Sequence, residues 1–371
     1  METTIRRLTI MNIAILGFGT VGRGVYEIIK NNGLDYINVV KILKRKGSKM
    51  DLPEMTDDFE CILNDDSIDT VVECMGGNDP AYDYVSRAMK KKKNVVTSNK
   101  LLLATHYDEL IKLSDEKDVY LLFEASVGGG IPWIENLSRV TFIDDVLGFK
   151  AIFNGTTNYI LDKMTNGYVD FDVALKETQE KGFAEQDPSS DIDGDDLLYK
   201  TIISANVATR KSFSMDGVLK FGIRHLTKED MAYFKKNHLV LKLITTFDRE
   251  NNLILVMPEL FDEKAYIANV GLNYNYVELY CKTEERLVFI GLGAGSLPTG
   301  HSVVQDLVRI DQHAVVPILT TEKINVKYSD FKEKFYVRYD DGKVEVVNGM
   351  KVEDLKNPKI KFVARFNEGL A

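Results

Sequence analysis

The sequence predicts an α/β protein that contains a Rossmann-type doubly wound parallel sheet, an α+β second domain and a short C-terminal extension. Three observations predict this fold class. An apolar strand leads directly into a glycine-rich turn and an amphipathic helix, and further strand–helix units follow up to about residue 123. After about residue 148 the pattern changes to several helices followed by longer strand-like runs, which is typical of an open sheet with helices on one face.

The glycine-rich turn is the first functional motif of the chain. A strand expected over 8–16 runs into the sequence G-F-G-T-V-G at 17–22, and apolar periodicity predicts a helix over 21–30. In this order the first glycine permits a tight turn, the second lets the backbone approach a pyrophosphate, and the third lets helix and strand pack closely. The alternative is a purely structural glycine turn. We expect the dinucleotide to contact Gly17, Gly19, Thr20, Val21 and Gly22.

The second strand, expected over 37–43, ends in a basic cluster. An NAD-preferring site usually has Asp or Glu about 20 residues after the glycine turn, where it binds the adenosine ribose. This chain has Lys44 and Arg45 there and no acid. Because cations suit a 2′-phosphate, the sequence favours NADP, with NAD as the alternative cofactor. A solvated basic turn would explain the same residues.

Further strand–helix units complete this part of the chain. Strands are expected over 70–74, 94–97 and 119–123, and helices over 79–92 and 107–117. In a doubly wound sheet the ligand lies beyond the carboxyl ends of the strands. The loops that follow these strands, 73–77, 97–100 and 124–132, should therefore face the cofactor, and they place Ser98 and Lys100 near it.

The most unusual segment, 182–200, gathers carboxylates around Pro188 and Gly194 and ends in a lysine. It leads into an apolar run that predicts a helix over 191–207. Asp196 and Lys200 are four residues apart, so on a helix they share one face and can form an ion pair. A carboxylate beside a lysine can hold the ammonium, or its proton, at a fixed position for acid–base chemistry. The alternative is a capped helix start with a surface ion pair.

The remaining elements follow from simple periodicity. Strands are expected over 148–154, 239–248, 253–258, 266–270 and 277–280, and helices over 158–166, 171–181 and 300–310. In the tail, 320–371, the alternating runs 335–339 and 343–347 flank a turn at Asp340-Asp-Gly342, which predicts a hairpin.

Composition limits the classes of protein. The chain has 371 residues, enough for two or three domains, and a net charge of −9 with a sequence pI near 5.3. This acidity argues against a protein that binds nucleic acid or an anionic membrane. No apolar run of the sequence is long enough to span a membrane. The three cysteines, Cys61, Cys74 and Cys281, form no metal or disulfide pattern, which indicates a cytoplasmic protein.

Six blocks of the sequence resemble, in order, those of the homoserine dehydrogenases. The blocks are 17–24, 97–100, 124–132, 153–160, 182–200 and 291–299. The resemblance implies NAD(P)-dependent interconversion of L-aspartate 4-semialdehyde and L-homoserine, in threonine and methionine biosynthesis, by hydride transfer with lysine acid–base assistance. It also implies a small amino-acid substrate and a homodimer.

The resemblance assigns catalytic and substrate-binding roles residue by residue. Lys100 and Lys200 match the two catalytic lysines, and Lys200 also contacts the substrate. The carboxylates that bind the substrate are matched by Glu185, Asp191 and Asp196.

The resemblance also implies a bound monovalent cation, Na⁺ or K⁺, with a structural role. Its ligands would come from Glu124 and from the backbone carbonyls of Val127, Gly129 and Ile131. Gly295 matches a late glycine loop that returns to the cofactor.

The implied organisation has a dinucleotide-binding domain over 1–135, completed by about 290–318, and a substrate-binding and dimerisation domain over 136–289. A C-terminal extension follows over 319–371. Many family members end in an ACT regulatory domain, but this tail lacks the expected length and resembles a shortened or replaced ACT-like module. We therefore do not expect the usual threonine feedback. The alternative is a hairpin that covers a sheet edge or extends the dimer interface.

Two other functions fit parts of the sequence. One is an NAD(P)-dependent dehydrogenase that acts on a different semialdehyde, and the other is a non-catalytic, nucleotide-binding sensor. The presence of both Lys100 and Lys200 argues against the sensor. The five histidines have no metal-ligand spacing, so we expect no catalytic metal.

Overall fold

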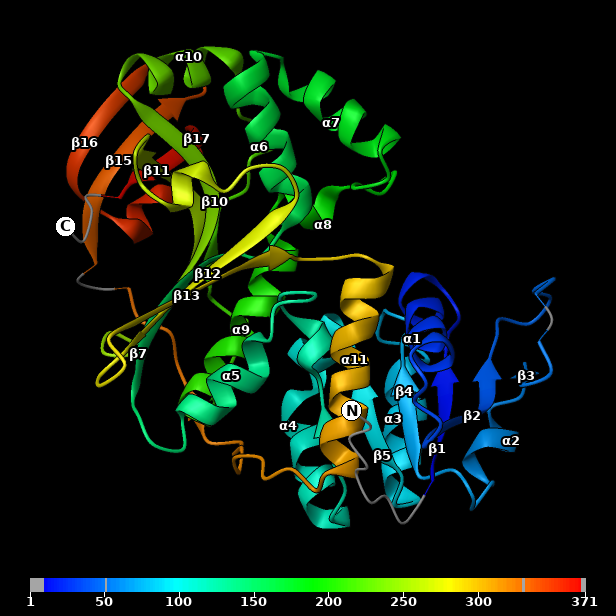
Figure 1. The fold of residues 1–371 in the computed structure, drawn as a ribbon. Coiled ribbons are helices and arrows are strands. Elements are labelled where there is room, and N and C mark those ends of the chain that lie inside the picture. Colours follow the sequence, from blue (N-terminus) through cyan, green and yellow to red (C-terminus); the bar gives the residue numbers. More distant parts are fainter. Residues whose placement is uncertain (1–9, 51, 329–330, 368–371) are drawn as a thin grey trace, which may run out of the picture. The chain divides into compact units, whose positions relative to one another are not determined.

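The computed structural model describes residues 10–50, 52–328 and 331–367, and the chain divides into two compact units (Figure 1). Unit 1 comprises Met1–Arg139 and Ala294–Glu322. Unit 2 comprises Val140–Gly293 and Lys323–Ala371. Leu8 and Thr9, which begin the first expected strand, lie outside the described residues.

Unit 1 is built on a six-stranded sheet in which neighbouring strands run parallel. The strand order is β3-β2-β1-β4-β5-β6, so the chain winds outward from β1 in both directions. This order confirms the predicted doubly wound sheet. The strands are β1 (Met11–Leu16), β2 (Ile37–Leu43), β3 (Met55–Thr56), β4 (Thr70–Glu73), β5 (Asn94–Thr97) and β6 (Leu121–Leu122).

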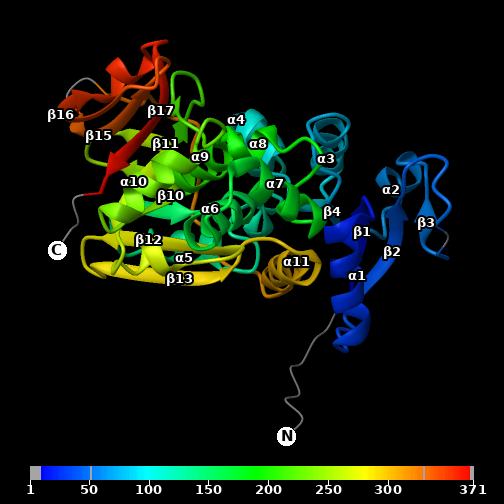
Figure 2. The same cartoon turned by 90° about the horizontal axis from the view of Figure 1, so that it is seen from above.

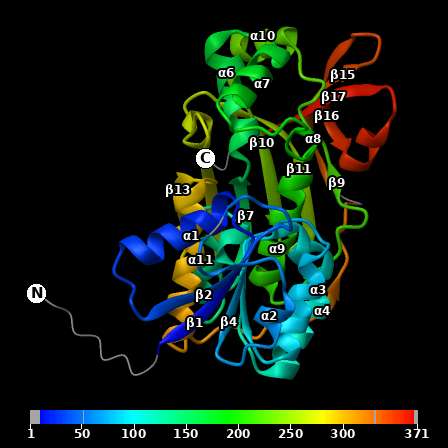
Figure 3. The ribbon, with the colours of Figure 1, turned by 90° about the vertical axis from the view of Figure 1, so that its right-hand side faces the viewer.

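Helices cover both faces of this sheet (Figure 3). Helices α1 and α11 pack on one face, where Val25, Ile29, Val303 and Leu307 share a core with the strands. Helices α3 and α4 contact each other and the strands β4 to β6 on the other face. The helices of unit 1 are α1 (Thr20–Asn31), α2 (Glu60–Leu63), α3 (Ala81–Lys90), α4 (Lys100–Lys117), the 3₁₀ turn η1 (Glu124–Ser126), α5 (Trp133–Val140) and α11 (Ser296–Asp311).

Two glycines allow α1 and α11 to approach each other closely. A Cβ atom at Gly24 would lie 2.1 Å from the carbonyl oxygen of Ser296, and one at Gly300 would lie 2.8 Å from the carbonyl carbon of Gly24. No real side chain tolerates such distances, so these backbones meet without intervening side chains. This contact fastens a segment from late in the sequence onto the first helix of unit 1.

Unit 2 contains a nine-stranded mixed sheet. Its order is β13-β12-β7-β10-β11-β17-β15-β16, and β9 also pairs with β11. Figure 2 shows β12 and β13 side by side at one end of this order. The strands are β7 (Val146–Ile152), β9 (Leu219–Lys220), β10 (Leu239–Asp248), β11 (Leu253–Asp262), β12 (Tyr274–Cys281), β13 (Arg286–Leu292), β15 (Lys332–Tyr339), β16 (Val344–Lys351) and β17 (Ile360–Phe366); β8 (Ser212–Phe213) pairs separately with β14 (Lys323–Ile324).

Helix α9 is the central helix of unit 2 and is buried along most of its length. It packs on β10 and β11, and even its polar residue Thr201 is enclosed, with its hydroxyl hydrogen-bonded to that of Thr245. The helices and 3₁₀ turns of unit 2 are α6 (Gly155–Gly167), α7 (Phe171–Glu180), α8 (Ser189–Ile192), α9 (Asp195–Thr209), α10 (Lys228–Lys236), η2 (Ile267–Asn269) and η3 (Val352–Lys356).

Residues from Lys323 onward belong to unit 2. The predicted hairpin is present as β15 and β16, and β17 then pairs in parallel with β11. Phe335 and Val363 of this segment share a core with Leu255 and Met257 of β11. The C-terminal segment is therefore part of the sheet and core of unit 2.

Three expected elements differ in the structure. The helix expected over 191–207 is interrupted at Asp193 and Gly194, because the chain takes a left-handed conformation at Gly194 (φ +87°), and its residues belong to α8 and α9. The strand expected over 266–270 is wrong, because the side-chain amide of Asn269 donates to the carbonyls of Glu263 and Ala265 and closes the turn η2. The helix expected over 107–117 begins earlier, at Lys100, because the Asn99 side chain accepts a hydrogen bond from the N–H of Leu102 and caps it.

Candidate active site

The glycine turn of unit 1 has the geometry of a nucleotide cradle. Gly17 has φ +93°, and a Cβ there would lie 3.0 Å from the carbonyl oxygen of Cys74. A Cβ at Gly22 would lie 2.1 Å from the carbonyl oxygen of Gly17. Gly19 precedes α1 with no side-chain cap, and nothing lies within 4 Å of its Cβ position. The helix start, with Thr20 and Val21, therefore offers uncapped N–H groups to an anion.

A buried carboxylate shapes the loops beyond β4 and β5. Glu73 is fully buried; its Oε1 accepts the N–H of Met75 at 2.7 Å, and its Oε2 accepts the hydroxyl of Thr97 at 2.6 Å. Burial raises the pKa of Glu73, and these hydrogen bonds oppose the rise. The amide of Asn99 donates to the carbonyl of Gly77 at 2.6 Å and joins the two loops.

Lys100 and Ser98 lie on the second of these loops. Lys100 is the first residue of α4, directly after the capping residue Asn99, and both Ser98 and Lys100 are half-buried. The position of Lys100 is thus set by a capped helix start rather than by an irregular loop.

Lys44 and Arg45, which follow β2, do not form a simple cluster of exposed cations. The ammonium of Lys44 donates to the carbonyl of Met50 at 2.8 Å, whereas Arg45 is exposed. Arg23 of α1 also reaches this loop, through the sulfur of Met50 at 3.3 Å. One predicted cation therefore shapes its own loop and the other faces solvent.

Gly295 lies beside the glycine turn within unit 1. It has φ +131° and precedes α11, and the hydroxyl of the next residue, Ser296, donates to the carbonyl of Thr20 at 2.7 Å. The late glycine loop and the first glycine turn are therefore hydrogen-bonded to each other.

The carboxylate of Glu124 is buried and caps a helix. Its two oxygens accept the N–H groups of Ile134 at 3.0 Å and Glu135 at 2.5 Å, at the start of α5. The N–H of Glu124 donates to Asp306 at 2.8 Å, and Arg309 pairs with Asp306 at 2.9 Å. Arg309 also pairs with Glu135 at 4.0 Å, and burial with repulsion from Asp306 raises the pKa of Glu124 to about 8.

The other residues of the expected cation site lie in the same turn. The carbonyl of Gly129 accepts the hydroxyl of Ser302 at 2.6 Å, and that of Ile131 accepts the N–H of Trp133 at 2.8 Å. The N–H of Val127 donates to the carbonyl of Glu124 at 3.4 Å. Each of these carbonyls has a second lone pair that these hydrogen bonds do not use. Within the described ranges, no cluster of three or more His, Cys, Asp or Glu could hold a metal ion.

In unit 2 the predicted Asp196–Lys200 pair is present and buried. The Lys200 ammonium donates to Asp196 Oδ2 at 2.8 Å and to the carbonyl of Phe153 at 2.6 Å. Lys200 is 9% exposed and Asp196 3% exposed, so this is not the surface ion pair of the alternative interpretation. The strand end at Phe153 and the helix start at Asp196 together hold the lysine.

Asn154 joins two of the predicted carboxylates, and sequence reasoning did not assign it a role. Its Nδ2 donates to Asp191 Oδ1 at 2.6 Å and to Asp196 Oδ2 at 2.8 Å, and its Oδ1 accepts the N–H of Thr157 at 2.8 Å. Asn154 is thus also the capping residue of α6. The signals in the sequence were an asparagine at a strand-to-helix junction and the place of this asparagine in the block 153–160.

The structure does not bring Glu185 into this hydrogen-bonded group. The side chain of Glu185 is exposed, and its backbone carbonyl accepts a hydrogen bond from Gln179 Nε2 at 3.1 Å. Two other acids of the stretch are bound elsewhere, because Arg224 pairs with Asp193 and Lys220 pairs with Asp195. Only part of the acidic stretch is therefore directed at Asn154.

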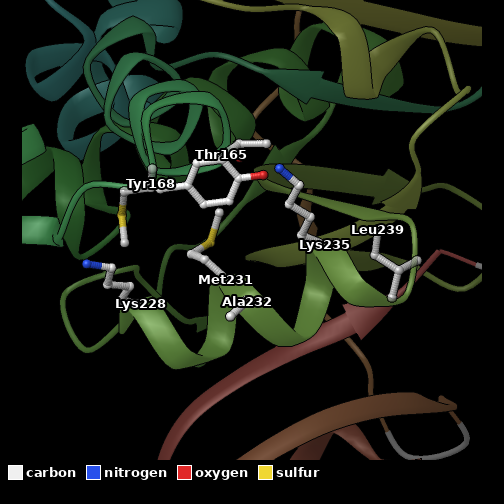
Figure 4. Close-up of a pocket in the computed structure, with 8 residues that line it drawn as sticks. Thr165, Tyr168, Lys228, Met231, Ala232, Lys235 and Leu239 are labelled. Carbon is white, nitrogen blue, oxygen red and sulfur yellow. The ribbon is translucent and has the colours of Figure 1, made fainter.

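A cavity of about 100 Å³ lies at the far end of α6 (Figure 4). It is lined by Met164, Thr165, Tyr168, Lys228, Met231, Ala232, Lys235 and Leu239. Helix α6 has 13 residues, so its two ends are roughly 20 Å apart. The cavity is therefore separate from the carboxylates that Asn154 holds at the start of the helix.

Comparisons with known proteins agree on one family. The family model described as homoserine dehydrogenase, NAD binding domain matches residues 17–124, and that described as homoserine dehydrogenase matches residues 132–308. The homoserine dehydrogenase of Bacillus subtilis is 35% identical over 315 residues, which cover 81% of this chain and 72% of the relative. That of Lactococcus lactis is 37% identical over 316 residues, which cover 81% and 74%.

Solved structures give the same result. A homoserine dehydrogenase from Thiobacillus denitrificans has a TM-score of 0.84 at 31% identity and covers 90% of this chain and 84% of its own. A homoserine dehydrogenase from S. aureus has a TM-score of 0.78 at 31% identity and covers 98% of this chain and 100% of its own. The second comparison includes the C-terminal strands.

Glu124 should lower the stability of the protein as the pH rises. Its folded pKa of about 8 exceeds the ordinary value of 4.5. Between these values the folded state holds a proton that the unfolded state has lost, so the free energy of unfolding falls with pH, by at most about 1.4 kcal/mol per pH unit. Glu124→Gln should remove this fall.

Urea unfolding at about pH 6 and about pH 8, in tetramethylammonium buffer, measures the free energy of unfolding at each pH. Glu116→Gln, at an exposed position of unit 1, is the control. An unchanged slope in Glu124→Gln would contradict the prediction.

Proposed function

Because this chain belongs to the homoserine dehydrogenase family, we propose that Lys100 and Lys200 are its catalytic lysines and that Asp191, Asp196 and Glu185 bind its substrate. The protein is an NAD(P)-dependent oxidoreductase that acts on a CH–OH group and interconverts aspartate 4-semialdehyde and homoserine. The observation that carries the assignment of residues is the buried group of Asn154, Asp196 and Lys200.

The substrate requires negative charge in its pocket. Homoserine and aspartate 4-semialdehyde both carry an α-ammonium group, which a carboxylate pairs with best. Asp191 and Asp196 are held within hydrogen-bond distance of one amide, so their carboxylates converge on the start of α6. Glu185, on an exposed loop, would approach the substrate from outside this group.

Lys200 is suited to act on the reacting oxygen. The bound nicotinamide supplies or accepts the hydride at the substrate carbon. As the aldehyde is reduced, negative charge develops on its oxygen, and an ammonium there stabilises the charge and delivers a proton. In the oxidation of homoserine the same amine accepts the hydroxyl proton. The Phe153 carbonyl and the Asp196 carboxylate accept hydrogen bonds from Lys200 and orient its ammonium.

Replacing either catalytic lysine should reduce turnover strongly. Lys200→Met and Lys100→Met remove an ammonium at the reacting centre, which should lower kcat at least about a hundredfold while the cofactor still binds. Initial rates of homoserine oxidation, read as reduced cofactor, measure the effect. Lys163→Met, at a partly exposed pair with Glu177, is the matched control and should keep normal turnover. Near-normal turnover of a Lys100 or Lys200 variant would disprove its role.

We propose NADP as the preferred cofactor. Lys44 and Arg45 follow β2 where an NAD-preferring site usually carries an acid. Lys44 holds its loop through Met50, and the exposed Arg45 can pair with a 2′-phosphate.

Arg45→Ala should therefore affect the two cofactors differently. The KM for NADP⁺ should rise roughly tenfold, the loss of one charge-assisted contact, and the KM for NAD⁺ should stay within about twofold. Lys49→Ala, which removes an exposed cation from the same loop, is the control. Equal changes for both cofactors would argue against 2′-phosphate recognition by Arg45.

We propose that Glu124 and the carbonyls of Val127, Gly129 and Ile131 hold a monovalent cation. The residues fit such a group because Glu124 and Asp306 are buried carboxylates that repel each other, and a nearby cation would offset this repulsion. The cation would stabilise the turn between η1 and α5.

Added Na⁺ or K⁺ should therefore raise the melting temperature more at about pH 9 than at about pH 6, because the cation favours the ionised form of Glu124. Thermal unfolding in tetramethylammonium buffer with and without either ion is the measurement. Glu124→Gln should lose most of the response. A response that is equal at both pH values and in the variant would contradict the site.

We further propose a cytoplasmic homodimer with a cofactor-binding domain over 1–135 and about 290–318, a substrate and dimerisation domain over 136–289 and an extension over 319–371. Strand β13 ends the strand order and exposes an apolar row, with Val288 44%, Ile290 55% and Leu292 38% exposed. Such a row on an edge strand suits pairing with a second copy.

The three free cysteines fit a reducing compartment. Within the described residues, no helix has both the length and the apolarity to cross a membrane.

A further inference from the structure

The loop that carries the proposed substrate carboxylates, residues 187–196, is called the acidic loop here. It is held from outside the site by residues 219–230, called the linking segment. The N–H of Ile223 donates to the carbonyl of Ile192 at 2.8 Å. A Cβ at Gly222 would lie 2.1 Å from the same carbonyl oxygen, so only glycine permits this approach. The two backbones are therefore in direct contact.

Side chains of the linking segment strengthen this contact. Arg224 binds Asp193 with two hydrogen bonds, at 2.8 and 2.6 Å, and donates to the hydroxyl of Ser189 at 2.9 Å. Lys220 pairs with Asp195. These pairs are partly exposed and individually weak, but a bidentate pair beside a backbone contact fixes orientation. The acidic loop is thus tied to the linking segment at both of its ends.

The linking segment is in turn held by the C-terminal segment. Tyr328 accepts the N–H of Leu219 at 2.8 Å and donates to the carbonyl of Ile254 at 2.6 Å. This phenol bridges β9 to β11 beside the two residue pairs that the strands share. The first residues of the linking segment therefore depend on a residue about 110 positions later.

The other end of the linking segment is held more firmly. Asp230 is fully buried; its Oδ1 accepts the Tyr336 hydroxyl at 2.7 Å and the Arg338 Nε at 2.9 Å, and its Oδ2 accepts Arg338 Nη2 at 3.0 Å. Arg338 also donates to the carbonyl of His225 at 2.5 Å. Asp230 forms a capping box with Thr227 at the start of α10. Strand β15 thus holds residues 225 to 230 through one buried carboxylate.

We propose that Arg338 and Tyr336 of the C-terminal hairpin are positioning residues for the substrate site, which they reach through the linking segment and the acidic loop. The inference rests on the proposed substrate-binding role of Asp191 and Asp196. Loosening Asp230 frees the linking segment, and the acidic loop then loses the support opposite Asn154. Homoserine binding weakens, while cofactor binding in unit 1 is unaffected.

The test compares Arg338→Met and Tyr336→Phe with Arg365→Met. Arg365 is a buried arginine of the C-terminal segment that also pairs with a buried carboxylate, Glu259, but its side-chain hydrogen bonds go to β10 and β11. In the purified full chain, Arg338→Met should raise the KM for homoserine at least tenfold and leave the KM for NADP⁺ within twofold, as estimated from the loss of a buried bidentate pair. Tyr336→Phe, which removes a single hydroxyl and should keep the fold, should raise the homoserine KM two- to fivefold.

Hydrogen exchange separates positioning from simple loss of stability. Amides of residues 189–194 should exchange faster in Arg338→Met and Tyr336→Phe, but not in Arg365→Met, even where the melting temperatures fall equally. An unchanged homoserine KM in both hairpin variants, or the same KM rise in Arg365→Met, would overturn the proposal. Asp191→Asn is measured in parallel. If its homoserine KM is unchanged, the proposed substrate role fails, and the positioning proposal fails with it; if it rises while the hairpin variants stay normal, only the positioning proposal fails.

Discussion

Charged and polar side chains that are almost excluded from water need hydrogen-bond or ion-pair partners. In unit 2 this requirement fixes the positions of the side chains at the junction of β7 and α6. Lys200, Asp196 and Asn154 are each at most 9% exposed, and each is bonded to another of them or to the backbone beside them. Removing one partner of a buried ion pair typically costs about 3–5 kcal/mol. The start of α9 can therefore take few positions relative to the end of β7, and the helix that supplies the lysine is located by the same bonds that orient it.

The same requirement operates at the strand ends of unit 1, with backbone amides as the partners. Glu73 receives two N–H groups from the turn that follows it and a hydroxyl from the next strand end. Glu124 caps α5 in a similar way. In both cases a buried carboxyl group receives backbone N–H groups and thereby shapes a turn at the carboxyl end of the sheet. Precise loops at the carboxyl end of the sheet are thus produced by acids that need not touch a ligand themselves.

Interactions between residues that are close in the sequence could be predicted, whereas interactions between distant residues could not. The glycine turn and the Asp196–Lys200 pair depend on spacings of a few residues, and both are visible in a single stretch of chain. Asn154 acts on a carboxylate 42 residues away, and no local pattern signals such a contact. The partners of Asp193 and Asp195 were hidden for the same reason. Local signals also misled, since the apolar residues from Tyr266 to Val270 suggest a strand, and Asn269 closes them into a turn.

The C-terminal segment is far from the proposed substrate residues in the sequence, but it is linked to them in the structure through Asp230. Its strands contribute to the same core as Leu255 and Met257 of β11. A tail that served only as a sheet cover would need apolar contacts alone. This one instead places a phenol and a guanidinium on the buried Asp230, at the cost of desolvating all three groups. Such an arrangement gives orientation more than stability, and the linking segment that it orients contacts the acidic loop at Ile192 and Asp193.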